Sequence, residues 1–141
     1  MSVMKPYRHK VQYYETDKMG VTHHSNYIRW MEEARVYFLE QIGFGYDKLE
    51  SQGVVSPVIA VSCEYKETTT FNDEILIDVK VKEFKGVRLI IEYSMVNAKS
   101  NSLVFWGTSQ HCFIGKNNMP VILKKDFPGV DAKLRELASC Y

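Results

Sequence analysis

The hydrophobic residues change their spacing once along the chain, and this change limits the folds that the sequence can adopt. Between Asn26 and Ile42 they recur at helical spacing, as Tyr27, Met31, Ala34, Phe38 and Ile42, with Trp30 and Tyr37 beside them. After Gly53 apolar residues alternate with polar ones instead, which is typical of strands with one buried face. The sequence therefore predicts one long helix followed by several strands.

The expected strands cover residues 7–14, 54–66, 75–82, 87–96 and 103–114, and residues 128–139 are compatible with a short terminal helix. Short turns such as Lys85-Gly86 join the later strands, so these strands must pair antiparallel. Ser25 or Asn26 can cap the long helix, and Gly43 suits its left-handed end. An apolar helix packed on an antiparallel sheet is an α+β arrangement.

Length and composition narrow the class of protein. A chain of 141 residues fits a single domain over residues 1–141. The net charge of +1 argues against nucleic-acid binding, and the longest apolar stretch, Val54 to Val61, is too short for a membrane span. The N-terminus has no apolar secretory segment. Three widely spaced cysteines, Cys63, Cys112 and Cys140, fit reduced thiols, so we expect a cytoplasmic protein.

The segment from Tyr14 to Tyr27 contains the side chains that are best suited to catalysis. It places Asp17, Gly20, His23 and His24 just ahead of the expected helix. A helix N-terminus presents unpaired N–H groups and partial positive charge, which suit an anion or a developing oxyanion. A carboxylate nearby can attack a carbonyl carbon or activate a water. Two structural interpretations stay open: Asp17 as an ordinary turn residue, and Gly20 as a source of backbone freedom.

A metal site is the main competing interpretation of the histidines. Neighbours on an extended chain point in opposite directions, so His23 and His24 would not easily share one ion, with or without His9. No metal-binding spacing occurs, and no glycine-rich nucleotide motif occurs either. We therefore expect no metal.

The same segment resembles the motif of the 4-hydroxybenzoyl-CoA thioesterase family, and most of all its short bacterial acyl-CoA thioesterases related to the Tol-Pal-associated enzyme. The matching positions are Tyr14, Glu15, Thr16, Asp17, Gly20, His24, Asn26 and Tyr27, followed by Glu33, Ala34 and Arg35. A second block, Glu64-Tyr65 through Phe71-Asn72-Asp73, resembles the next family segment. Thr68 and Thr70 replace a usual proline and a frequent arginine there, and His23 replaces a frequent aromatic residue.

The resemblance implies a hotdog fold, an antiparallel sheet wrapped around one long central helix, in a homodimer or homotetramer without cofactor. It implies hydrolysis of acyl-CoA thioesters, with Asp17 as nucleophile or general base and the backbone N–H of His24 polarising the carbonyl. Gly20, His23 and Tyr27 are then candidate substrate contacts, although helical spacing alone also accounts for Tyr27 as a core residue. An ordinary aspartate is ionised at neutral pH, which favours the nucleophile slightly.

Three other functions stay open at this point. A non-catalytic hotdog module could bind acyl-CoA and would not need Asp17. A hotdog hydratase or dehydratase could use His24 with Asp17. A hydrolase of the same chemistry could act on thioesters of acyl-carrier protein, where basic surface residues would meet an acidic partner.

Overall fold

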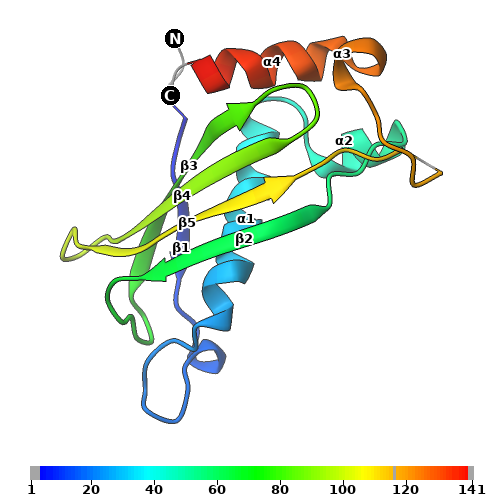
Figure 1. The fold of residues 1–141 in the computed structure, drawn as a ribbon. Helices are drawn as coiled ribbons and strands as arrows, with labels where there is room; N and C mark the ends of the chain where they lie inside the picture. Colours follow the sequence, from blue (N-terminus) through cyan, green and yellow to red (C-terminus); the bar gives the residue numbers. More distant parts are fainter. Residues whose placement is uncertain (1–3, 116, 140–141) are drawn as a thin grey trace. The chain divides into compact units, whose positions relative to one another are not determined.

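The computed structural model describes residues 4–115 and 117–139 (Figure 1). The chain forms two compact units. The first comprises residues up to 38, 63–79 and 93–107, and the second comprises residues 39–62, 80–92 and those from 108 on. Cys63 and Cys112 are free thiols, while Cys140 lies outside the described residues. Within the described part of the chain, no helix combines the length and the apolar character needed to cross a membrane.

Five strands form one antiparallel sheet in the order β1-β3-β4-β5-β2 (Figure 1). The strands are β1 (Tyr7–Lys10), β2 (Val58–Tyr65), β3 (Glu74–Phe84), β4 (Leu89–Asn97) and β5 (Leu103–His111). The helices are α1 (Ser25–Gln41), α2 (Tyr46–Ser51), α3 (Leu123–Asp126) and α4 (Pro128–Ser139), with a 3₁₀ turn η1 at Tyr13–Glu15. This is the expected α+β arrangement of one long helix and an antiparallel sheet.

The predicted first strand is wrong beyond Lys10. The chain leaves β1 there and closes the η1 turn, because the Glu15 carboxylate accepts the backbone N–H of Gln12 at 2.8 Å. The predicted helix 26–42, the later strands and the terminal helix are confirmed with shifts of a few residues at their ends. The short helices α2 and α3 were not predicted, since so few residues carry no clear periodicity.

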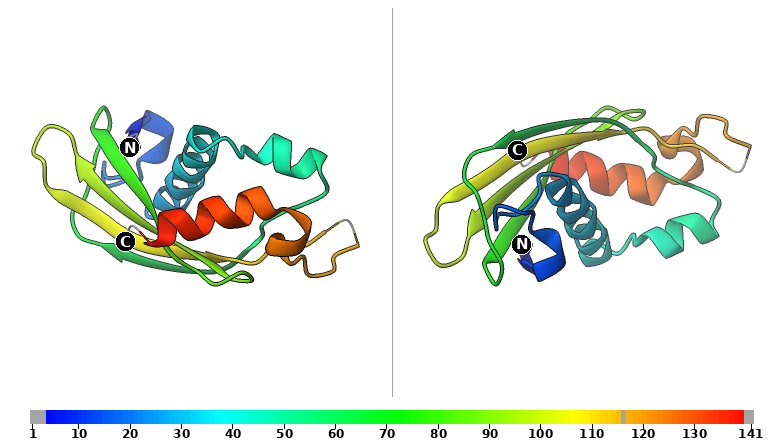
Figure 2. Two further views of the ribbon diagram at one scale, coloured as in Figure 1. Left: turned by 90° about the horizontal axis from the view of Figure 1, so that it is seen from above. Right: turned by 90° about the horizontal axis from the view of Figure 1, so that it is seen from below.

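In the first unit, α1 lies against the strands (Figure 2), and its aromatic side chains are buried there. Tyr27, Trp30, Met31 and Ala34 are all less than 5% exposed. The Tyr27 ring stacks on Phe105 of β5, with their centroids 5.4 Å apart. This packing fixes the N-terminal part of α1 against the strands and leaves its first residues at the surface.

Arg35 of α1 is buried, although arginine side chains are mostly exposed in proteins. It is 7% exposed and donates to the Tyr93 hydroxyl at 3.0 Å. Both residues belong to the first unit. A long side chain with a polar tip can lie in the core when its guanidinium finds acceptors there.

The second unit holds the last turn of α1, α2, the β3–β4 turn and the C-terminal helices. Gly43 adopts the left-handed conformation that its position after α1 predicts, with φ +87°. On the other side of this unit, Phe84 packs edge-on against Phe113, and the Arg135 guanidinium lies 5.5 Å above the Phe84 ring. Arg135 also donates to Asp131 at 2.7 Å, an i, i+4 pair within α4, and its contact with Phe84 joins the helix to the end of β3.

Candidate active site

Asp17 lies in a tight loop closed at both ends. Thr16 pairs with Thr22 in an antiparallel bridge, and the Asp17 N–H donates to the Val21 carbonyl at 2.8 Å. The Gly20 N–H returns to the Asp17 carbonyl at 3.0 Å, and Gly20 has φ +80°, a conformation that suits glycine. The predicted role of Gly20 in backbone freedom is therefore confirmed.

The Asp17 carboxylate is half-buried and oriented by its own loop. Oδ1 accepts the Met19 N–H at 2.8 Å, which is an Asx turn. The interpretation of Asp17 as a turn residue is thus correct for Oδ1. Within the described residues Oδ2 accepts no hydrogen bond, so one oxygen is held in place and the other is open to a reacting group.

The start of α1 uses its backbone N–H groups locally, with one exception. The His23 N–H donates to the Glu15 carbonyl, the Ser25 N–H to His23 Nδ1, the Asn26 N–H to the His23 carbonyl and the Tyr27 N–H to the His24 carbonyl. In the described part of the chain, the His24 N–H donates to no protein acceptor. This amide lies at the positive end of a helix of 17 residues, where an anionic oxygen is stabilised.

Neither predicted cap residue caps the helix in the expected way. The Ser25 hydroxyl pairs with His23 Nδ1 at 2.8 Å, and the Asn26 amide donates to the carbonyls of Glu15 and His23. A cap needs a side-chain oxygen that accepts a helix N–H, and among the described residues neither Ser25 Oγ nor Asn26 Oδ1 accepts one. Asn26 instead ties the helix start to the segment that precedes Asp17.

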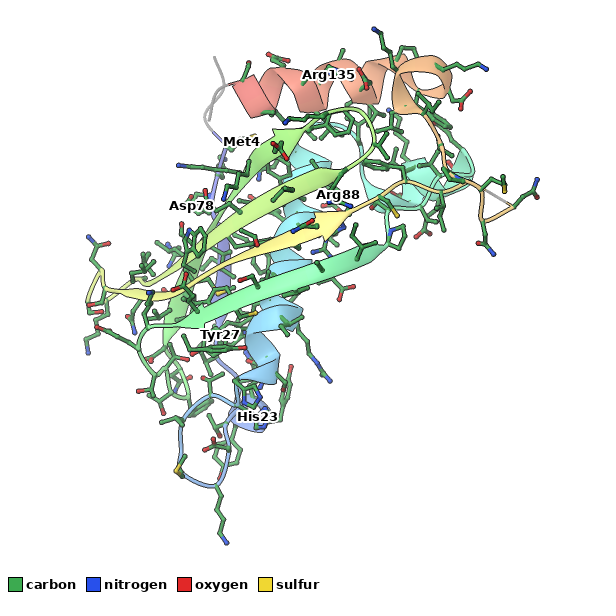
Figure 3. All side chains as sticks on the ribbon, in the orientation of Figure 1. Met4, His23, Tyr27, Asp78, Arg88 and Arg135 are labelled. Carbon is green, nitrogen blue, oxygen red and sulfur yellow. The ribbon has the colours of Figure 1, made fainter. Side chains whose placement is uncertain are left out.

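His23 and His24 do not point in opposite directions, as an extended chain would require. Their rings stack with centroids 4.4 Å apart, because the chain turns at His24 into α1. Both side chains are exposed at the N-terminal end of α1, where Figure 3 labels His23. Among the described residues, no group of three or more His, Cys, Asp or Glu side chains is placed to hold a metal ion.

Tyr65, at the end of β2, was not singled out by the sequence as a site residue. Its ring contacts His24 edge-on at 6.0 Å, and its hydroxyl is 3.5 Å from the His24 carbonyl. Burial, followed by the neighbouring Cys63 side chain, raises the pKa of Tyr65 to about 12, so the hydroxyl keeps its proton at neutral pH. Tyr65 is 47% exposed, so its ring lies at the surface next to His24. The sequence alone could not place Tyr65 next to His24, because a tyrosine in a strand can face either side of the sheet and only the register of β2 decides which.

Tyr27 lies beneath this surface, close to the point labelled in Figure 3. It is 4% exposed, and its ring contacts Tyr65 edge-on at 5.4 Å. Its hydroxyl pairs with Thr69 Oγ1 at 2.9 Å, and Thr69 Oγ1 pairs with Thr22 Oγ1 at 2.6 Å. The structure therefore places Tyr27 in the core of the first unit, with its hydroxyl linking α1 to the loop that carries Asp17.

A buried carboxylate, Glu15, supports the loop from behind. Its two oxygens accept from Gln12 N, His9 Nε2 and Trp30 Nε1. Burial acts to raise the pKa of Glu15, but the hydrogen bonds from Gln12, Trp30 and His9 together hold it below its usual value. Glu15 is therefore a buried anion at neutral pH. The motif contained this residue, but its spacing gave no sign of these partners.

A second histidine–hydroxyl pair occurs in the other unit. Ser109 Oγ and His111 Nε2 are 2.8 Å apart on β5, and His111 Nδ1 is 3.3 Å from the Ser56 carbonyl. Both side chains are only 1% exposed. A nucleophile must reach its substrate, so this pair serves as a hydrogen-bonded part of the core.

Comparison with known proteins gives consistent results. A family model described as the thioesterase-like superfamily matches residues 11–134. The "Putative acyl-CoA thioesterase YneP" of Bacillus subtilis (strain 168) is 31% identical over 120 residues, covering 84% of this chain and 86% of that protein. The acyl-CoA thioester hydrolase YbgC of Escherichia coli O157:H7 is 28% identical over 94 residues, covering 67% of this chain and 70% of that protein.

The solved structures include close matches to the fold. The crystal structure of a DHNA-CoA thioesterase from Staphylococcus aureus superposes with a TM-score of 0.89 and 28% sequence identity. The alignment covers 96% of this chain and 91% of that one. The expected hotdog fold is confirmed by this match.

Replacing Thr69 with valine tests the hydroxyl chain under the site. Thr69→Val keeps the shape but leaves the buried Tyr27 hydroxyl and Thr22 Oγ1 without their shared partner. An unsatisfied buried polar group costs about 1–3 kcal/mol. Urea denaturation should show a loss of this size. Thr68→Val, at a neighbouring exposed position, is the control and should stay close to wild type. Equal stability of the two variants would contradict the role given to Thr69.

Proposed function

The chain belongs to the thioesterase-like superfamily, and on that premise we propose that it hydrolyses the thioester bond of an acyl-CoA, giving the free acid and CoA. The observation that carries the proposal is the unpaired His24 N–H at the start of α1 beside the loop that orients Asp17. An oxyanion donor and a carboxylate are the two groups that this hydrolysis needs. The relatives described as acyl-CoA thioesterases support the choice of thioester.

The reaction proceeds in two steps. The open oxygen of Asp17 attacks the thioester carbonyl carbon, and the carbonyl oxygen becomes an oxyanion that accepts the His24 N–H. The C–S bond then breaks, and CoA leaves as a thiolate that takes a proton from solvent. Water hydrolyses the resulting mixed anhydride, which releases the acid and restores the carboxylate. In the alternative, Asp17 takes a proton from the attacking water, with the same donor at the oxyanion.

The side chains around the His24 amide receive the acyl group. The exposed imidazole of His23 lies along one side, and Gly20 shapes the turn that presents Asp17. Tyr27 contributes from below through its contact with Tyr65, so its role is to support the exposed ring. His24 acts through its backbone, and its own imidazole is replaceable in this mechanism.

The same proposal covers the organisation of the chain. One family match over residues 11–134 supports a single hotdog domain over residues 1–141. The free thiols of Cys63 and Cys112 support the proposed cytoplasmic location. The protein needs no metal or organic cofactor for the chemistry above.

A homodimer or homotetramer is proposed because the edge strand β2 presents apolar side chains to solvent. Val58, Ile59 and Val61 are 45%, 48% and 41% exposed, although native edge strands usually carry charges or are covered. Light scattering in solution should give a mass of two or four chains. A mass of one chain would contradict this part of the proposal.

The function is tested by thiol release from short, long and aromatic acyl-CoAs with wild type, Asp17→Asn and His24→Ala. An asparagine can still accept the Met19 N–H, so Asp17→Asn removes the charge while keeping the turn. We expect wild-type turnover on part of the panel and a loss in kcat of at least about a hundredfold in Asp17→Asn. We expect His24→Ala to keep most of the wild-type kcat, because it retains the backbone N–H.

The matched control is Asp78→Asn, a charge removal at an exposed position of β3, which should keep wild-type activity. Turnover that survives Asp17→Asn would keep the reaction and reject Asp17. Binding of acyl-CoA without any turnover would favour the non-catalytic module, and turnover only with acyl-carrier protein would reject CoA as the carrier.

A further inference from the structure

We propose that Glu15 is a positioning residue of this site, whose buried carboxylate fixes the main chain that holds both the Asp17 loop and the His24 amide. The inference rests on the proposed function for its effect on turnover. The inference also has a structural part, which does not depend on turnover: the Glu15 carboxylate keeps the main chain from Thr16 to Tyr27 in position.

The Glu15 carboxylate is clamped from three elements of the first unit. His9 Nε2 of β1 lies 2.8 Å from Oε1, the Gln12 N–H reaches the same oxygen at 2.8 Å, and Trp30 Nε1 of α1 lies 2.7 Å from Oε2. A carboxylate only accepts hydrogen bonds, so the imidazole proton in this contact is on His9 Nε2. The side chain of Glu15 is 5% exposed. Hydrogen bonds to an ionised group are stronger than neutral ones, and here they are shielded from water.

The main chain of the same residue holds the start of α1. The Glu15 carbonyl accepts the His23 N–H at 2.9 Å and the Asn26 amide at 2.9 Å. The next residue, Thr16, pairs with Thr22, and Asp17 follows it. A shift of Glu15 would therefore move the His23–Asn26 turn, which presents the His24 N–H, and the loop that presents Asp17.

The site needs a carboxylate at position 15 because all of its partners donate. A glutamine side chain has the same shape but offers one oxygen and one NH₂ group. Its NH₂ would face either the Trp30 indole N–H or the pair formed by His9 and Gln12, and one of these contacts would become two opposed donors. A displacement of about 1 Å in a reacting group can lower the rate by about a hundredfold, so the position of Glu15 is sensitive.

The surroundings of His9 complete the cluster. Its ring lies on Trp30 with centroids 4.5 Å apart, and its Nδ1 lies 3.6 Å from Glu33 Oε2. Glu33 also accepts the Tyr7 hydroxyl at 3.2 Å. The Glu33 side chain is 44% exposed and faces the other nitrogen of the His9 ring, so the cluster has one buried anion that supports the loop and one peripheral anion.

The test compares Glu15→Gln with Glu32→Gln, an exposed position on α1, and with Glu33→Gln at the edge of the cluster. We expect Glu15→Gln to lower kcat by about ten- to a hundredfold with a KM within about threefold of wild type, since the contact that it removes lies behind the site. Both controls should keep kcat within about threefold. In an Asp17→Asn background, Glu15→Gln should add little, because both changes act on the same step.

Two measurements that do not need turnover test whether Glu15 keeps the main chain from Thr16 to Tyr27 in position. The protein has two tryptophans, so the indole N–H of Trp30 can be assigned by NMR, and Glu15→Gln should move it while Trp106 keeps its position. Amide hydrogen exchange should rise in peptides from Thr16 to Tyr27 and stay at the wild-type rate in β4 and β5. A uniform rise across the chain would instead indicate general destabilisation and would overturn the inference.

The outcomes separate the two proposals. Wild-type exchange and kcat in Glu15→Gln would overturn the positioning role even if the enzyme hydrolyses acyl-CoA. A wild type without turnover would reject the proposed function. In that case local loosening of residues 16–27 in Glu15→Gln would still support Glu15 as the residue that holds the helix start, and unchanged exchange would refute it.

Discussion

The first turn of an α-helix leaves backbone N–H groups without partners inside the helix, and the site depends on how α1 satisfies them. The preceding residues satisfy almost all of them, through the carbonyls of Glu15, His23 and His24 and through the His23 imidazole. One donor, the His24 N–H, is left over at the positive end of the helix dipole. A water or a substrate oxygen is its natural partner.

The other half of the site follows from the tight loop between η1 and α1. The Thr16–Thr22 bridge brings the two ends of the loop together, and the Asx turn at Asp17 fixes one carboxylate oxygen while leaving the other open. The Met19 side chain of this loop is 82% exposed, and the loop is held by hydrogen bonds of Asp17, Met19 and Gly20. This explains why a buried anion, Glu15, lies directly behind it with three donors.

The sequence predicted the elements whose hydrophobic pattern is periodic, and for the site it offered candidate residues from one contiguous motif. The hydrophobic residues of α1 keep their helical spacing over the whole helix. Gly43 follows the helix at a position where φ is positive. Asp17 and His24 became candidates because the motif that contains them is contiguous in the sequence. Among the amides from His23 to Tyr27 in the described structure, the donor assigned to His24 is the one that is left unpaired.

What the sequence missed depends on contacts between distant elements. The end of β1 follows from the Glu15 carboxylate rather than from the strand propensity of Tyr13 and Tyr14. Tyr65 reaches the site only through the register of β2, and Arg35 is buried because Tyr93 accepts its guanidinium. None of these partners is adjacent in the sequence, so periodicity and local motifs could not reveal them.

The central claim is that the His24 N–H receives the thioester oxygen, and an NMR titration tests it most directly. Amide resonances would be followed while a non-hydrolysable acyl-CoA thioether that retains the carbonyl group is added to Asp17→Asn. The account predicts that the His24 amide shifts downfield, as expected for a new hydrogen bond, and is among the resonances that move most, while Asn101 in the β4–β5 turn stays in place. Saturable binding that leaves the His24 amide unmoved would contradict the account.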